Sequence, residues 1–180
     1  SSAPVTVNGG QFGVSGTTIP SISSLARTFT YTTGGFHVGD VTHTLDVDIA
    51  LTGAASLSKS GPGVIKLSGA NDFTGGISMG AGDNGWIEVD SPTDLGTGAK
   101  VANFIASSTV AVGGFRLLND VTVSSVDLNL AGRNVNAATQ HVLLNVSGNN
   151  KWTGNINIVS GGGTYYLRSD SGRLELSGIL

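Results

Sequence analysis

The sequence predicts an all-β chain, arranged mainly as a parallel β-solenoid, with an antiparallel β-sandwich as the alternative fold. Three observations support this prediction. Apolar and polar residues alternate with a period of two, helical periodicity is nearly absent, and a strand-turn-strand unit recurs within the chain. Gly, Ser, Thr, Asn and Val dominate and turn residues recur every few positions, which favours short strands over helices.

The clearest alternation lies between residues 44 and 51, where aliphatic side chains share one face and Asp46 and Asp48 share the other. The same reading assigns apolar faces to Ile65 and Leu67, Ile77 and Met79, Ile87 and Val89, Val121 and Val123, Leu128 and Leu130, Val142 with Leu144 and Val146, Ile156 and Ile158, and Leu174 and Leu176. We therefore expect a core that includes Leu67, Ile77, Val89, Leu130, Val146, Ile156 and Leu176.

An internal repeat favours the solenoid. Residues 67–79 recur at 146–158 in the same order of strand, tight turn, aromatic residue, Thr-Gly and second strand. Units that cannot close a core alone bury their apolar faces by stacking on neighbours. Residues 1–40 lack the repeat and are expected to form an N-terminal cap or pairing element, with β-solenoid repeats over 41–180. Turn asparagines such as Asn71 and Asn150 either stack into an amide ladder or simply tolerate the turn conformation.

The composition narrows the function class. Only 12% of the residues are charged, the net charge is −3, and the few Lys and Arg residues are scattered, so a nucleic-acid partner is not expected. There is no Cys to form disulfides or thiolate metal sites, and no apolar run approaches the roughly 18–20 residues of a transmembrane segment. The start at Ser1-Ser2-Ala3-Pro4 resembles a mature product from which an export signal has been removed.

The segment Leu57-Ser-Lys-Ser-Gly-Pro-Gly-Val-Ile-Lys-Leu-Ser-Gly-Ala-Asn-Asp-Phe-Thr-Gly-Gly76 and the later Asp94-Leu95-Gly96 resemble the passenger-associated repeat of bacterial autotransporters, also called the autotransporter-associated β-strand repeat. One copy covers roughly 46–98. A second, at 146–178, is degenerate, since Asn155 replaces the second Gly. The resemblance implies a right-handed parallel β-helix, a cell-surface or extracellular location, a role in adhesion or matrix formation, and no catalytic residues in the repeat.

Catalytic, cofactor and metal sites are not expected. His37, Asp40 and His43 lie close to Asp46 and Asp48 in sequence, but the alternation turns His43 away from the aspartates, whereas metal ligands must converge. Carbohydrate-cleaving β-helices use outward carboxylate pairs, which makes Asp46 with Asp48, or Glu88 with Asp90, the candidates for the alternative function of a carbohydrate-active enzyme. Neighbouring like charges on an exposed strand also serve solubility.

We expect an extracellular structural or adhesive protein that associates with itself into fibres. Strand-like segments lie at both ends of the chain; they either offer backbone groups for pairing with another copy or are the cut edges of a longer passenger protein. A surface glycan is a possible further partner of a glycan-binding module, with Trp86 as an outward aromatic residue. The candidate partner-contact residues are Trp86, Val5, Val7, Leu174, Leu176 and Ile179.

Overall fold

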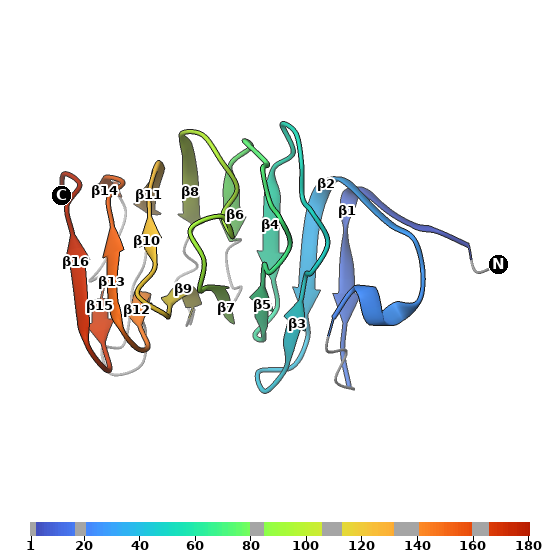
Figure 1. Ribbon diagram of the computed structural model, residues 1–180, viewed down its shortest axis with the longest axis horizontal. Coiled ribbons are helices and arrows are strands. Elements are labelled where there is room, and N and C mark those ends of the chain that lie inside the picture. Colours follow the sequence, from blue (N-terminus) through green and yellow to red (C-terminus); the bar gives the residue numbers. More distant parts are fainter. Residues whose placement is uncertain (1–2, 17–20, 80–84, 106–112, 132–140, 160–165) are drawn as a thin grey trace.

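The fold is a parallel β-solenoid of about six turns. The computed structural model describes residues 3–16, 21–79, 85–105, 113–131, 141–159 and 166–180. Figure 1 shows the strands side by side along the long axis, with the N-terminal and C-terminal coils at opposite ends. One 3₁₀ turn, η1 (Ser23–Leu25), interrupts the β-structure. The prediction of an all-β solenoid is confirmed, and the antiparallel sandwich is wrong because every strand pairing is parallel among the described residues.

Three parallel sheets form the sides of the coil. Sheet A runs in the order β1 (Val5–Val14), β2 (Phe29–Val38), β4 (Leu57–Ser60), β6 (Ile77–Met79), β8 (Lys100–Ile105), β11 (Val126–Ala131) and β14 (Ile156–Val159). Sheet B runs through β3 (Thr44–Asp46), β5 (Val64–Lys66), β7 (Gly85–Val89), β9 (Gly113–Leu117), β12 (His141–Asn145) and β15 (Tyr166–Ser169). Sheet C contains β10 (Thr122–Val123), β13 (Asn149–Trp152) and β16 (Arg173–Leu176). From β2 onward, successive strands of the sequence lie in different sheets, and sheets A and B gain one strand per turn, with sheet C joining from β10.

The core consists of side-chain columns that run along the solenoid axis. Because the strands are parallel and in register, an inward residue of one coil stacks on the inward residue of the next. A column in sheet A contains Phe36, Lys59, Met79, Phe104, Leu130 and Ile158, and one in sheet B contains Leu45, Ile65, Ile87, Phe115, Leu143 and Leu167. Most of these side chains are fully buried, so each coil contributes the same few layers to one continuous core.

The predicted inward residues are buried in five of seven cases. Leu67, Ile77, Val89, Leu130 and Ile156 lie in the core, whereas Val146 and Leu176 are only half-buried. In β12 the predicted phase was wrong, because the pairing of β12 with β15 shifts register after His141 and places Leu143 and Asn145 in the core columns. Asn145 is fully buried there, and its amide donates to Ser169 Oγ and the Ser171 carbonyl, each at 2.8 Å.

The Thr-Gly motif of the repeat marks a close contact between coils. Gly75 and Gly154 occupy equivalent positions in the two copies. A Cβ atom on Gly75 would lie 2.1 Å from the Ala55 carbonyl oxygen, and one on Gly154 would lie 1.8 Å from the Val126 carbonyl oxygen. A side chain would force the neighbouring backbone apart, so glycine is required where the coils approach each other.

The first 40 residues supply the first strands of sheet A. β1 pairs with β2 in parallel, with register shifts at Asn8 and before Gln11. Ser21 forms an isolated parallel bridge to Asp46, which joins the N-terminal segment to sheet B. The segment therefore continues the coil stack, and the division at residue 40 stays a prediction.

Candidate functional site

The C-terminal end of the solenoid exposes the last layer of the core. Ile158 continues a sheet A column but is 68% exposed, and Leu167 continues a sheet B column but is 40% exposed. The preceding members of these columns, Leu130 and Leu143, are buried. Among the described residues, no further coil stacks on these two side chains, which lie in core register.

The predicted contact residues of the C-terminal segment lie at this end. Leu174 and Leu176 on β16 are half-buried against the core, and Ile179 is 76% exposed. The Ile179 backbone is still tied to the coil beneath it, because its N–H donates to Asn155 Oδ1 at 3.0 Å and its carbonyl accepts from Ile156 N–H at 2.9 Å. We call the surface formed by Ile158, Leu167, Leu174, Leu176 and Ile179 the C-terminal end face.

The N-terminal end is formed by β1, which is the terminal strand of sheet A. Val5 is half-buried, whereas Val7 is 5% exposed and points into the core, so only its backbone is available to a partner. Phe12 is half-buried and packs edge-on against Phe29 with ring centroids 5.3 Å apart. This end therefore offers a long strand edge above a partly covered core.

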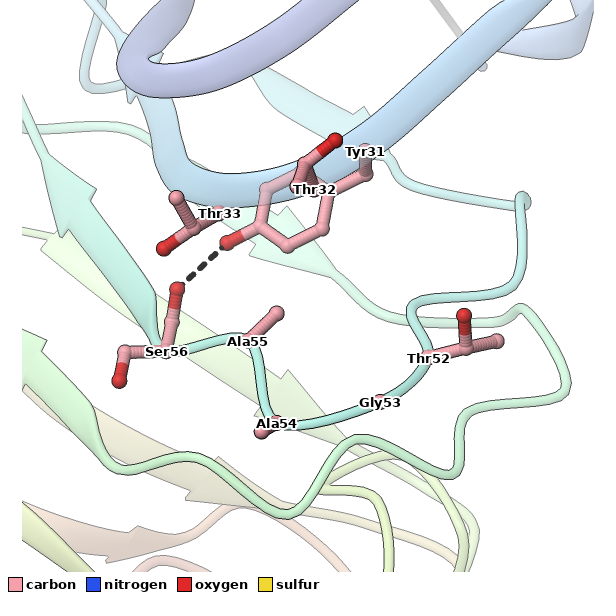
Figure 2. Close-up of a pocket in the computed structure, with 8 residues that line it drawn as sticks. All are labelled: Tyr31, Thr32, Thr33, Thr52, Gly53, Ala54, Ala55 and Ser56. Atoms are coloured by element: carbon pink, nitrogen blue, oxygen red, sulfur yellow. Dashed lines mark hydrogen bonds between the residues drawn. The ribbon is translucent and has the colours of Figure 1, made fainter.

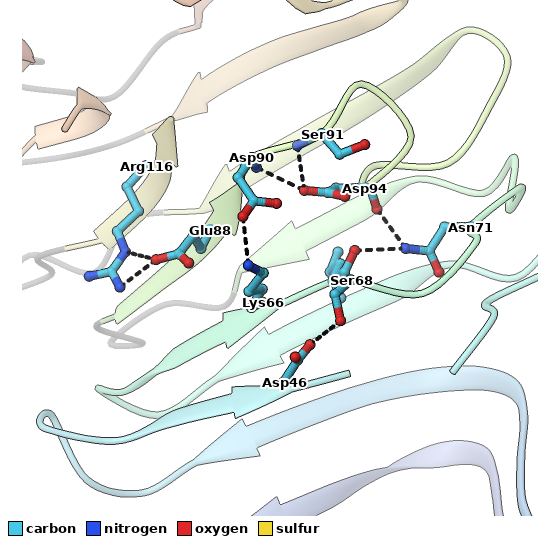
Figure 3. Close-up of polar contacts among 10 residues, drawn as sticks. Asp46, Lys66, Ser68, Asn71, Glu88, Asp90, Ser91, Asp94 and Arg116 are labelled. Atoms are coloured by element: carbon cyan, nitrogen blue, oxygen red, sulfur yellow. Dashed lines mark hydrogen bonds and ion pairs between the residues drawn. The ribbon is translucent and has the colours of Figure 1, made fainter. Parts of the chain in front are cut away.

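Charged residues form an alternating column on the outer face of sheet B. Asp46, Lys66, Glu88 and Arg116 lie in register on successive coils. Figure 3 shows these side chains joined across coils: Arg116 binds Glu88 at 2.6 Å, and Lys66 binds Asp90 at 2.6 Å. Half-exposed pairs of this kind stabilise a protein by at most about 1 kcal/mol each, so the column contributes mainly by avoiding like charges on stacked strands.

The carboxylates considered for catalysis are all engaged with partners. Asp46 accepts a hydrogen bond from Ser68, and Asp48 accepts one from the Ser23 backbone N–H at 2.9 Å. Glu88 and Asp90 belong to the ion pairs of the charged column. These contacts cross-link neighbouring coils, which is a structural use of the four carboxylates.

Asp94 is a buried carboxylate that closes the turn after β7. It is 2% exposed and accepts hydrogen bonds from the backbone N–H groups of Asp90 and Ser91 at 2.8 and 3.0 Å. Burial raises its pKa to about 6, against the lowering effect of these two hydrogen bonds. The carboxyl therefore caps the turn, and its charge is costly at neutral pH.

The turn asparagines do not form a ladder with each other. Asn71 is 3% exposed, accepts from Leu51 N–H at 3.0 Å, and donates to the carbonyls of Leu67 and Asp94 at 3.1 Å each. Asn150, in the second repeat copy, likewise accepts from a backbone N–H of the preceding coil, at 2.7 Å. Each asparagine therefore fastens its turn to the backbone of neighbouring coils, and the ladder hypothesis for this pair is wrong.

An amide ladder does exist, on the outer face of sheet A. Asn129 donates to Asn103 Oδ1 at 3.1 Å, and Asn157 donates to Asn129 Oδ1 at 2.9 Å. The three asparagines occupy the same register position on β8, β11 and β14. The sequence does contain a signal for this ladder, because an asparagine occupies the outward phase of three successive sheet A strands. The ladder considered from the sequence involved only asparagines in turns, so this one was not predicted.

Two buried lysines are the other polar groups that the sequence reading missed. Lys59 is fully buried between Phe36 and Met79 in a core column, and its ammonium donates to the Gly61 carbonyl. Lys100 donates to the Leu95 carbonyl at 2.6 Å and lies 4.0 Å from the centroid of the Phe73 ring. Burial lowers the pKa of Lys100 to about 8.

His37, Asp40 and Trp86 each contact other residues of the chain. Nδ1 of His37 lies 2.8 Å from Ser60 Oγ, and Asp40 accepts hydrogen bonds from Thr42 that lower the pKa of its carboxyl. In the part of the chain that the structure describes, no three His, Asp or Glu side chains gather as metal ligands. Trp86 is half-buried on the outward face of β7, between Val64 and Gly114 of the adjacent coils.

No protein-family model, curated protein or solved structure matches this chain. The described residues contain no helix with the length and hydrophobicity of a membrane span.

Proposed function

We propose that this chain is a non-catalytic structural or adhesive β-solenoid module of an extracellular fibre, matrix filament or adhesin. The observation that supports this proposal most directly is the C-terminal end face, where two core columns reach solvent at Ile158 and Leu167. Full burial of an aliphatic side chain of this size contributes about 1.5–3 kcal/mol, so covering both is a substantial driving force for adding a coil.

A coil stacked on this face satisfies the backbone as well as the side chains. Each sheet ends in a strand, β14, β15 or β16, whose outer edge pairs with no other strand among the described residues. The N-terminal coil of the chain has a strand at the sheet A position, β1, and only the isolated bridge of Ser21 at the sheet B position, whereas sheet C begins at β10. The occupant that we propose is the N-terminal coil of a second copy, because β1 leaves the opposite edge of sheet A open in the same way.

Head-to-tail stacking of this kind produces a filament. The two contacting surfaces differ and lie at opposite ends of the molecule (Figure 1), so each added copy leaves a new end face. The low fraction of charged residues, the richness in Gly and the resemblance to autotransporter passenger repeats favour an extracellular location. The ion-paired carboxylates of sheet B favour a structural role over catalysis.

Sedimentation velocity over a range of protein concentrations, combined with electron microscopy, tests this proposal. We expect concentration-dependent assembly into thin filaments. Ile158→Lys places a charge on the C-terminal end face and is expected to abolish assembly without unfolding the chain, because Ile158 is already 68% exposed. Ser78→Lys adds the same charge to the exposed side of sheet A and is the matched control.

Assembly that is lost in Ile158→Lys and retained in Ser78→Lys supports end-face stacking. A wild-type chain that stays monomeric at every concentration contradicts the proposal. Filaments that form equally well with Ile158→Lys also contradict it, because the contact then lies elsewhere on the surface.

A further inference from the structure

A groove of roughly 440 Å³ opens between β2 and the segment 52–56. Figure 2 shows Tyr31 on one side, with Thr52, Gly53 and Ala54 along the opposite rim. We call this the Tyr31 groove. Its volume lies within the range of about 300–1,000 Å³ that is usual for small-molecule sites.

The groove exists because β2 is longer than its partner. β2 spans ten residues, but it pairs with β4 only from Gly34 to His37. Beside its first half, the chain segment 52–56 stands away from the strand instead of pairing with it. The Tyr31 hydroxyl spans the gap between the two segments and donates a hydrogen bond to the Ser56 carbonyl at 2.7 Å. The Gly34 carbonyl oxygen lies 3.0 Å from the same hydroxyl and is a second acceptor. The bridge holds the two walls at a fixed distance, so the groove is a built feature of the fold.

The lining is neutral and rich in hydroxyl groups. The side-chain hydroxyls of Thr32, Thr33, Thr52 and Ser56 make no hydrogen bond to any described residue. Each of them can donate one hydrogen bond and accept two. Burial raises the pKa of Tyr31 to about 12, so the phenol is uncharged at physiological pH. The groove therefore presents several available hydroxyls around an aromatic ring, with no ionised group in its lining.

We propose that the Tyr31 groove is a binding subsite for a neutral saccharide unit. A sugar ring carries hydroxyls on its edge that match the donors and acceptors of Thr32, Thr52 and Ser56. It also carries C–H groups on its faces that match the Tyr31 ring and Ala54. This assignment does not rest on the proposed assembly, because the groove lies on the side of the solenoid and contains no residue of either end contact.

The same observations disfavour the other classes of ligand. An anionic ligand would need a cation, and no Lys, Arg or His lines the groove. An extended peptide would need a regular strand edge, but the register of β1 against β2 skips Thr32, and bulges of this kind disrupt pairing. The Tyr31 bridge to Ser56 also crosses the space that an inserted strand would occupy.

Titration of the ¹⁵N-labelled chain, followed by NMR, tests the proposal. The probes are the neutral disaccharides lactose, maltose, cellobiose and chitobiose, with glucuronic acid as an anionic probe and an alternating Thr-Val peptide as a strand probe. We expect at least one neutral disaccharide to shift the amide signals of residues 31–33 and 52–56. The double variant Thr32→Val, Thr52→Val is expected to weaken its binding about tenfold or more, the equivalent of about 1.4 kcal/mol.

Thr30→Val is the matched control, because Thr30 is an exposed threonine of the same strand that does not line the groove. Ala54→Arg fills the groove from its exposed rim and is expected to abolish binding while the rest of the spectrum stays unchanged. The proposal is overturned if no neutral disaccharide binds, if glucuronic acid or the peptide binds more tightly than all four, or if Ala54→Arg leaves binding intact. Equal losses in Thr30→Val and in the double variant also overturn it.

Discussion

Replacing Asn71 by Ala tests how the turns hold the coils together. The Asn71 side chain connects three successive coils, since it accepts from Leu51 N–H and donates to the carbonyls of Leu67 and Asp94. Only 3% of this residue is exposed, so water does not readily replace the lost partners in the variant. The exposed ladder provides the comparison: Asn129 also bridges neighbouring coils, through Asn103 and Asn157, but at the surface.

The expected cost follows from the three buried hydrogen bonds. Each contributes about 0.5–1.5 kcal/mol, and a buried N–H left without an acceptor costs about 1–3 kcal/mol. Asn71→Ala should therefore lower the free energy of unfolding by roughly 2–4 kcal/mol. Asn129→Ala should lower it by less than about 1 kcal/mol, because water takes over the ladder contacts.

Urea denaturation followed by circular dichroism measures both values. Equal denaturant slopes in the wild type and the two variants confirm that the midpoints can be compared. The reasoning is refuted if Asn71→Ala and Asn129→Ala differ by less than about 0.5 kcal/mol, since burial of the amide would then make no difference.

Three further predictions concern the core, the close contacts and pH. Leu67→Asp is expected to abolish the cooperative urea transition, whereas Lys66→Gln on the outer face should cost no more than about 1 kcal/mol. Gly69→Ala places a Cβ 2.1 Å from a backbone carbonyl of the preceding coil and should lower the melting temperature sharply, whereas Gly10→Ala meets nothing within 4 Å and should leave it unchanged. The pKa of Lys100 is about 8 in the folded chain and 10.5 in the unfolded chain, so the unfolded chain binds more protons between these values. Stability relative to Lys100→Met should therefore rise with pH across that window, and a difference that stays constant or falls would contradict the assignment.

The solenoid could be predicted from two patterns in the sequence, the alternation of apolar and polar residues and the internal repeat. Two-residue alternation identifies buried strand faces, and the repeat at 67–79 and 146–158 shows that these faces stack on copies of themselves. The prediction failed locally in β12, where a register shift moves Leu143 and Asn145 into the core columns and Leu144 out of them. The alternation pattern of one strand cannot reveal a register shift. A shift means that one strand has an extra residue relative to its partner, and only the pairing of the two strands shows it.

The polar interior was harder to predict. Lys59 shares the inward phase of Leu57, but a lysine normally marks the solvent face, and its burial depends on polar partners such as the Gly61 carbonyl, which the alternation pattern does not reveal. The Tyr31 groove depends on the unequal lengths of β2 and β4, which the sequence does not state. The end face was anticipated at Leu174, Leu176 and Ile179, but its most exposed core-column residue, Ile158, was expected only as part of a buried strand.

A disulfide between copies tests the proposed head-to-tail stacking most directly. Gln11 and Asn157 occupy the same outward column of sheet A, at its first and last strands. If a second copy continues the stack in register, these positions lie about 4.8 Å apart across the contact, within the roughly 4.4–6.8 Å that a disulfide spans. The chain has no Cys of its own, so a Gln11→Cys, Asn157→Cys variant reports only this contact.

We predict that mild oxidation of the double variant gives a ladder of covalent oligomers on a non-reducing gel, whereas each single variant gives dimers at most. A double variant that keeps the β-sheet circular dichroism spectrum and yields no species beyond a dimer would contradict head-to-tail stacking.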